Sequence, residues 1–377
     1  MPADARPSDE AQRIVAIDGV RGVALFGVLT VNLITEFRVS IFRQFLPVTV
    51  PPDAVEAMVE RAVELALESK AFALFSLLFG IGLGIQFERL QQTGRAAYYL
   101  SRRLIALLAF GLVHLLFIWN GDILAEYAIA GFVVLPFLRL PAERLIKGAA
   151  VCLVIFFGLA FVSQPLSLPA APALERHVAA ATHVYANGSY AEIWRFSLGE
   201  LRLMLPLHVN VFPRTVGLMF LGAGLWKSGL LNGSVENERA IAVFAGAATA
   251  IGFGLASLSG PAIVPAMLAP IVLALGYGAL IYTIAQHAPH AARPLAALGR
   301  MAFTNYILQS VVFSLVFFGF GAGQFGKLGA AEALILGVAT YVAQIVLSSI
   351  WLRYHRFGPL EWLWRVMMYG HSPRRAS

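Results

Sequence analysis

Long apolar runs recur along the chain, and short polar links separate them. A run of roughly 18 or more mostly apolar residues is long enough to cross a bilayer as a helix. Ten such runs are expected, at 14–36, 71–89, 101–119, 122–140, 145–163, 212–229, 239–258, 262–286, 301–320 and 331–353. The pattern therefore predicts an all-α fold, a polytopic transmembrane helix bundle of about ten spans.

The polar segments suggest a division of the chain into two bundles. A long extracytoplasmic segment, 164–211, would separate a five-span bundle at 14–163 from a second at 212–353. Polar tails at 1–13 and 354–377 flank the two bundles. The tail at 1–13 has no apolar core of its own, so the first run is expected to act as an uncleaved insertion signal.

One link carries its own helical pattern. Residues 53–69 place Val55, Met58, Val59 and Val63 on one stripe, with acids opposite, which predicts an amphipathic helix. It would lie along the outer membrane surface or over the bundle. An ordinary connecting loop is the alternative.

Composition agrees with a membrane protein. The chain is 59% hydrophobic and 13% charged, whereas soluble domains are about a quarter charged. Most of the 28 lysines and arginines lie in links that this layout places on the same side as both termini, so both termini are predicted to be cytoplasmic. The same topology accounts for the net charge of +7 without nucleic acid. The single cysteine, Cys152, excludes an internal disulfide and a cysteine-rich metal site, and no metal is predicted.

The first run contains hydrophilic side chains that need a protein or water environment. An ionisable group at the bilayer centre costs about 2.5–3.5 kcal/mol on insertion scales. Asp18 and Arg21 are three residues apart, and Asn32 follows Arg21 by eleven residues, close to three helical turns. One face can therefore hold all three. A purely structural ion pair is the alternative for Asp18 and Arg21.

The third and fourth runs supply a histidine and an acid at a similar depth. His114 lies in the outer half of its run, and Asp122 lies in the tight turn that follows. Asn32 is expected in the same outer half, so these three are the candidate catalytic residues. The alternatives are a helix cap for Asp122 and an interhelical hydrogen bond for His114.

Further polar side chains are candidates for binding a donor or substrate, together with Asp18 and Arg21. They are Arg102, Arg103, Arg214, Arg300, Asn305 and Gln309. Arg102 and Arg103 have a plain alternative as topology and lipid-headgroup residues. Asn305 and Gln309 are four residues apart on one face, and simple interhelical hydrogen bonds are the alternative there.

Several segments together resemble a known family. They are "RIVAIDGVRGVALFGVLTVNL", "FSLLFGIGLGIQFER", "RRLIALLAFGLVHLLFIWNGDILAEYAIAG", "LGRMAFTNYILQS" and "RFGPLEWLWR". These resemble the YeiB-type bacterial inner-membrane family, a domain-of-unknown-function type, from about residue 13 to 370. The resemblance implies a multi-pass protein of the bacterial inner membrane and does not by itself imply a reaction.

A more distant similarity concerns the start of the first run. The D-x-x-R-G pattern at 18–22 is similar to that of the transmembrane acyltransferases, which pass an acyl group from a cytoplasmic donor, often acetyl-CoA, to an acceptor beyond the membrane. The polysaccharide branch has a histidine eleven residues after the arginine, where this chain has Asn32. The glucosamine branch has asparagine there and its catalytic histidine further into the outer loop. No histidine lies between Asn32 and His114 here, so His114 is the substitute candidate.

The leading hypothesis is therefore acyl transfer, with acyl-CoA as a co-substrate and no bound cofactor. Arg21 and the inner-edge arginines would meet the donor's phosphates. His114 would act as general base, Asp122 would orient it, and Asn32 would donate to the developing oxyanion.

Two other classes of function stay open. Polar lines in the first, ninth and tenth runs are also compatible with a transporter or exporter of a small polar or lipid-linked solute. A non-catalytic sensor or partner-binding protein is the third class. The expected partners are the lipid bilayer and a small-molecule or lipid-linked substrate, no nucleic acid is expected, and no oligomeric state is predicted.

Overall fold

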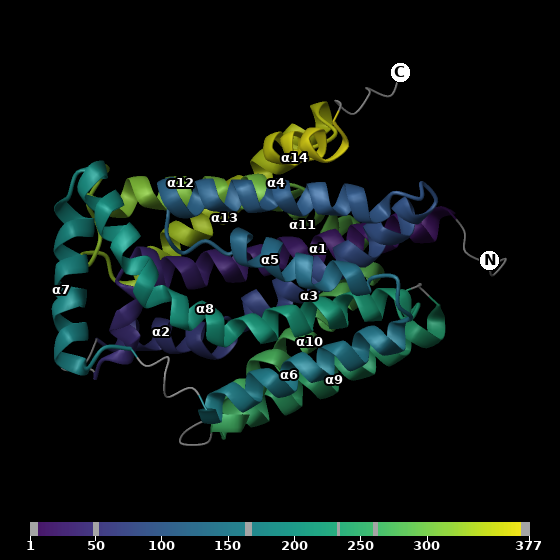
Figure 1. Ribbon diagram of the computed structural model, residues 1–377, viewed down its shortest axis with the longest axis horizontal. Coiled ribbons are helices and arrows are strands. Elements are labelled where there is room, and N and C mark those ends of the chain that lie inside the picture. Colours follow the sequence, from purple (N-terminus) through teal and green to yellow (C-terminus); the bar gives the residue numbers. More distant parts are fainter. Residues whose placement is uncertain (1–6, 48–52, 163–167, 232–233, 259–262, 371–377) are drawn as a thin grey trace.

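The computed structural model describes residues 7–47, 53–162, 168–231, 234–258 and 263–370. Within these ranges the regular structure is helical and there is no strand. Most of the long helices run along the long axis of the molecule, and α7 stands across one end (Figure 1). The predicted tail 1–13 is already helical from Pro7. Arg6, Arg374 and Arg375, which contribute to the predicted charge asymmetry, lie outside the described residues, as does the predicted boundary at 163 and 164.

Among the described residues, eight helical stretches are long and apolar enough to cross a membrane. They involve α1 (Pro7–Asn32), α3 (Lys70–Gln91), α4 (Ala96–Phe117), α6 (Ala142–Val162), α8 (Tyr190–Lys227), α9 (Val235–Ser257), α10 (Ile263–His287) and α13 (Ala330–Tyr354). Helices α11 (Pro289–Arg300) and α12 (Ala302–Phe317) meet at a bend of 68°. If this bent pair is counted as one span, it is the ninth among the described residues. The protein is therefore an all-α, multi-pass membrane protein.

The expected span 122–140 differs from the others. Helix α5 covers only Leu124–Val134, and a 3₁₀ turn, η3 (Leu135–Phe137), extends it to a short apolar helix. The chain before it, from 118 to 123, is irregular and largely buried. Irregular backbone at membrane depth is tolerated where protein covers it, because its polar groups find partners there. This buried link carries Asp122.

The expected segment 164–211 is mostly helical. It contains α7 (Ala171–Asn187) and the first part of α8. Ser189 and Glu192 form a capping box at the start of α8, which explains why the helix begins there. At 1.5 Å per residue, the 38 residues of α8 span about 57 Å, well beyond the roughly 30 Å hydrocarbon core. Helix α8 is therefore longer than one crossing needs, and its internal Pro206 and Pro213 are positions where it can bend.

The predicted amphipathic helix is present as α2 (Ala54–Ala66), capped by Asp53, whose Oδ1 accepts from Glu56 N at 2.9 Å. Val55 and Met58 of the predicted apolar stripe are 55% and 65% exposed, so no described protein segment covers this part of the stripe.

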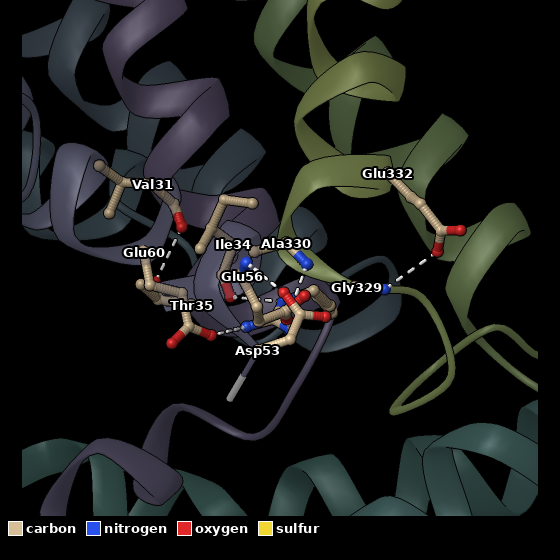
Figure 2. Close-up of polar contacts among 10 residues, drawn as sticks. Val31, Ile34, Thr35, Asp53, Glu56, Glu60, Gly329, Ala330 and Glu332 are labelled. Carbon is tan, nitrogen blue, oxygen red and sulfur yellow. Dashed lines mark hydrogen bonds and ion pairs between the residues drawn. The ribbon is translucent and has the colours of Figure 1, made fainter. Parts of the chain in front are cut away.

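Two of the three acids of α2, Glu56 and Glu60, face Arg38, whereas Glu64 is exposed. Arg38 is buried just after η1 (Leu33–Phe37), the π-helical end of the first span, and pairs with Glu56 at 2.5 Å and also with Glu60. Glu56 Oε1 also accepts from Ala330 N at 2.8 Å at the start of α13 (Figure 2). A buried guanidinium needs anionic partners, and this need sets the orientation of α2. The short 3₁₀ helix η2 (Ile41–Phe45) follows Arg38.

Glycines let two helix pairs approach backbone to backbone. A Cβ on Gly80 of α3 would lie 2.1 Å from Met219 O of α8. A Cβ on Gly299 of α11 would lie 1.9 Å from Asp18 O of α1. Such small-residue contacts are typical of membrane helix packing. The second contact brings Asp18 and Arg21 beside Arg300.

Candidate functional site

A cavity of about 310 Å³ opens between α1, α3, α4, α5, α12 and the C-terminal helix α14 (Pro359–Tyr369). This volume is at the small end of the range for ligand pockets, about 300–1,000 Å³. Five arginines line it: Arg21, Arg103, Arg300, Arg356 and Arg365. We call it the arginine cavity. Arg300, Arg356 and Arg365 are exposed at its mouth, whereas Arg21 and Arg103 are partly buried.

Two acids also line the arginine cavity, and both already have partners. Asp18 Oδ1 accepts from Arg21 Nη1 at 2.5 Å. Glu361 accepts from Thr304 N at 3.0 Å and from Thr304 Oγ1 at 2.5 Å. Among the described residues, the other four arginines form no ion pair with a carboxylate, so the mouth is suited to an anion.

Helix α14 forms one wall of the mouth. It packs against α4 and α12, and in Figure 1 it lies over one side of the bundle. Trp364 Nε1 donates to Arg103 O at 2.8 Å, and the Arg103 guanidinium lies 4.0 Å from the Trp364 ring centre. Burial raises the pKa of Glu361, opposed by the hydrogen bonds from Thr304.

Sequence reasoning treated 354–377 as a tail and so missed Arg356, Glu361 and Arg365. The available signal was Pro359 after Gly358, a common helix start, followed by alternating tryptophans and charges. That signal predicts a short helix, but not where it docks.

The arginine cavity becomes apolar with depth. Leu78, Phe79, Leu107 and Phe303 line its walls. Val28 of α1 also lines it and lies two helical turns beyond Arg21, or about 10 Å along the axis. Ile123, Tyr127 and Tyr306 line its inner part. A ligand with an anionic head and an apolar chain would match this gradient.

His114 and Asp122 lie directly beyond Tyr306. His114 Nδ1 and Asp122 Oδ2 are 2.8 Å apart, and both side chains are fully buried. Asp122 Oδ1 accepts from Ala125 N at 2.7 Å, so this acid caps α5 and also orients the imidazole. The rings of His114 and Tyr306 are 5.2 Å apart.

The other imidazole nitrogen of His114 is the second notable feature of this pair. His114 Nε2 is buried and forms no hydrogen bond within the part of the chain that the structure describes. Buried polar atoms in native proteins are nearly always satisfied, so an unpaired one needs an explanation. A bound substrate group would supply one.

Asn32 lies on the same face of α1 as Val28, one turn further along the helix. It is buried, and its Oδ1 also has no hydrogen-bond partner among the described residues. Asp18, Arg21, Val28 and Asn32 thus follow one face of α1, from the mouth to beyond the apolar part of the arginine cavity. No described hydrogen bond joins Asn32 to His114.

Three of the candidate polar residues take part in helix contacts away from the arginine cavity. Arg102 donates to Met367 O at 2.8 and 3.1 Å, which ties α4 to α14. Asn305 donates to Ser348 at 2.9 Å, and Gln309 donates to Gln344 at 2.7 Å. The last two contacts join α12 to α13.

Arg214 is also placed away from the arginine cavity. It is buried in α8, and its guanidinium lies 5.8 Å from the ring centre of Phe156. Its Nε has no described hydrogen-bond partner.

A further polar network lies near the buried link, and sequence reasoning missed it. Glu200 of α8 accepts from Asn120 at 3.0 Å and from Tyr185, and lies 2.8 Å from His177 Nε2. Asn120, Tyr185 and Glu200 line a void of about 20 Å³, close to the space of one water. The residues of this network come from separate elements, so no local sequence pattern predicts that they meet.

A second histidine–carboxylate pair joins α8 to α5. His208 Nδ1 is 2.7 Å from Glu126 Oε2, and Thr215 Oγ1 donates to Glu126 Oε1 at 2.7 Å. Within the described ranges, no three His, Cys, Asp or Glu side chains come together as a metal-binding group.

Comparisons with known proteins give a consistent family relationship. Residues 225–371 match a family described as "Protein of unknown function (DUF418)". The uncharacterized protein YxaH of Bacillus subtilis (strain 168) is 30% identical over 390 residues, covering 97% of this chain and 96% of the relative. The uncharacterized protein YeiB of Escherichia coli (strain K12) is 30% identical over 394 residues, covering 94% and 96%.

The family match covers only part of the arginine cavity. It includes Arg300, Arg356 and Arg365, whereas Arg21 and Arg103 precede it. The two full-length relatives align over both parts, so the whole bundle with its C-terminal helix is the unit that they share with this chain.

Proposed function

The chain belongs to the DUF418 family, and we propose that it is a membrane-bound acyltransferase that moves an acyl group from acyl-CoA to an extracytoplasmic or lipid-linked acceptor. One observation carries the proposal. His114 and Asp122 form a fully buried histidine–carboxylate pair directly beyond a cavity whose mouth is suited to an anion. The second imidazole nitrogen of His114 has no hydrogen-bond partner among the described residues. A general base near the end of a donor pocket is what acyl transfer requires.

The proposed orientation follows from charge. Arginines and lysines are concentrated in links at the same side as the mouth of the arginine cavity, so we assign that side to the cytoplasm of a bacterial inner membrane. The donor would then enter from the cytoplasm, and the acceptor would approach from the opposite face.

The chemistry assigned to His114 depends on its tautomer. With Nδ1–H donating to Asp122, Nε2 carries the lone pair that can take a proton. The acceptor's oxygen or nitrogen attacks the thioester carbonyl as His114 removes its proton. The C–S bond then breaks, and the CoA thiolate leaves and takes the proton from the imidazolium.

Asn32 has a supporting role in this scheme. Its amide would donate to the carbonyl oxygen as negative charge develops there. The Oδ1 of Asn32, which is buried and unpaired among the described residues, is an acceptor and would suit the hydroxyl or amine of the incoming acceptor. Tyr306 separates His114 from the open cavity, so the proposal requires this ring to move when the donor enters.

The test is a direct assay of transfer. Purified protein in lipid nanodiscs would receive labelled acetyl-CoA or longer acyl-CoAs with hydroxyl- and amine-bearing acceptors, and free thiol and labelled product would be followed together. We expect acceptor-dependent thiol release that is lost in His114→Ala.

The same assay can reject the proposal. No thiol release with any donor and acceptor pair would overturn it. In sealed vesicles, movement of an unmodified solute without any product would indicate the transporter or exporter class instead.

A further inference from the structure

The arginine cavity carries more positive charge than one phosphate would neutralise. Five arginines and two acids line it, an excess of three positive charges. The singly charged phosphate of a common bilayer lipid would leave most of this excess unbalanced. A head group with two or more negative charges would balance it far better.

The arginines are held at two levels. Arg21 and Arg103 are partly buried, and Arg103 Nε has no hydrogen-bond partner among the described residues. Arg300, Arg356 and Arg365 are exposed at the mouth. Two tiers of guanidinium groups suit two phosphates joined in line.

Their side chains are partly organised before any ligand binds. The guanidinium groups of Arg103 and Arg365 lie 4.0 Å and 4.2 Å from the ring centres of Trp364 and Phe357. Arg300 Nη2 donates to Arg356 O at 3.1 Å. Stacking uses the face of a guanidinium and leaves its N–H edge free for phosphate oxygens.

The space beyond the arginines restricts the group that can be attached to the head group. It is apolar, and the whole cavity is only about 310 Å³. A slender chain fits this space, whereas a bulky two-chain lipid does not.

We infer that the mouth of the arginine cavity is a diphosphate site, that α14 and the residues before it complete this site through Arg356 and Arg365, and that its ligand is a diphosphate joined to one slender chain. Coenzyme A, with its pantetheine arm, is one source of this chemistry, and an isoprenoid diphosphate is the other. The choice of coenzyme A rests on the proposed function, whereas the diphosphate assignment rests on the arginines.

Direct binding measurements on the full-length protein test the inference. The protein would be placed in zwitterionic nanodiscs and titrated calorimetrically with coenzyme A, 4′-phosphopantetheine, farnesyl diphosphate and farnesyl monophosphate. We expect at least one diphosphate to bind on the order of tenfold or more tightly than its monophosphate counterpart, with affinity falling as salt rises.

Two variants test the contribution of the C-terminal segment. Arg356→Gln and Arg365→Gln should each weaken diphosphate binding on the order of tenfold, because each removes one charge-assisted contact. Arg353→Gln is the matched control, since Arg353 is exposed on α13 and does not line the cavity. Arg365→Lys, which keeps the charge, should bind more tightly than Arg365→Gln.

Several outcomes would overturn the inference. The first is equal affinity for mono- and diphosphates. The second is unchanged diphosphate binding in both glutamine variants, provided that both variants unfold at the wild-type temperature. The third is displacement of the bound diphosphate by phosphatidylglycerol. Diphosphate binding without any acyl transfer would support the site and count against the proposed function. Binding of farnesyl diphosphate but not coenzyme A would support the site and exclude the proposed donor.

Discussion

Among the described residues, three histidine–carboxylate pairs have nearly equal lengths, and two of them, on either side of the start of α5, differ in their surroundings. His114 and Asp122 are 2.8 Å apart, and His208 and Glu126 are 2.7 Å apart. The first pair is completely buried, whereas the side chains of His208 and Glu126 are 34% and 11% exposed. Both carboxylates use their second oxygen, Asp122 for the Ala125 amide and Glu126 for a threonine hydroxyl.

The functional difference lies at the second imidazole nitrogen. His208 is partly exposed, so its remaining nitrogen can be solvated. His114 Nε2 is buried, unpaired among the described residues and next to Tyr306 at the inner part of the cavity. A short histidine–acid contact is therefore a weak sign of catalysis by itself, and the free, sheltered nitrogen beside a cavity carries the argument.

The largest expected effect separates the two histidines. Loss of a general base lowers the rate about 10²–10⁴-fold, so His114→Ala should reduce acyl transfer by that factor. His208→Ala should leave transfer near the wild-type rate, because His208 has no described ring contact with Tyr306, through which His114 adjoins the arginine cavity. Initial rates of thiol release from acyl-CoA in nanodiscs measure both. Equal losses in the two variants would remove the distinction between the pairs.

Substitution of the two acids, Asp122 and Glu126, should affect acyl transfer in the same order as substitution of their histidines. Asp122→Asn keeps an oxygen that can cap α5. Its amide nitrogen would donate to His114 Nδ1, however, and this no longer favours the tautomer in which Nε2 carries the free lone pair. We expect transfer to fall about 10²-fold or more, with little loss of stability. Glu126→Gln is the matched control and should keep the wild-type rate. A fully active Asp122→Asn would reduce Asp122 to a helix cap.

Local patterns predicted the parts of this arrangement that are close in the sequence. Apolar run lengths were sufficient for an all-α membrane bundle, and helical spacing placed Asp18 beside Arg21. His114 and Asp122 are eight residues apart across one turn, so their common depth followed from the sequence. The roles of all four residues stay predictions.

Contacts between distant segments were not predictable in this way. Arg102 and Met367 are separated by 265 residues, and Thr304 and Glu361 by 57. These contacts dock α14, so the C-terminal arginines could not be assigned to the mouth from spacing alone. Asn305 and Gln309 show the converse, since their polarity is visible in the sequence but their partners on α13 are not.

A glycine beneath the buried pair should matter more than a glycine on the surface. A Cβ on Gly111 would lie 2.4 Å from Ala125 N and 3.0 Å from Asp122 Oδ1. Gly111→Ala should therefore cost about 1–3 kcal/mol of stability through overpacking and should also lower transfer. At Gly246 of α9 a Cβ meets nothing within 4 Å, so Gly246→Ala should be neutral or stabilising by up to about 1 kcal/mol. Unfolding in detergent measures the two, and equal stabilities would contradict the packing argument.

The smallest effect concerns the second pair alone. Thr215→Val removes the hydroxyl that donates to Glu126 Oε1 but leaves His208 bound to Oε2. Loss of one such hydrogen bond should cost about 0.5–1.5 kcal/mol, while acyl transfer stays unchanged. Unfolding and transfer assays on the same preparation check both parts. A loss of transfer without a loss of stability would mean that the His208–Glu126 pair contributes to the reaction, and the contrast between the two pairs would then fail.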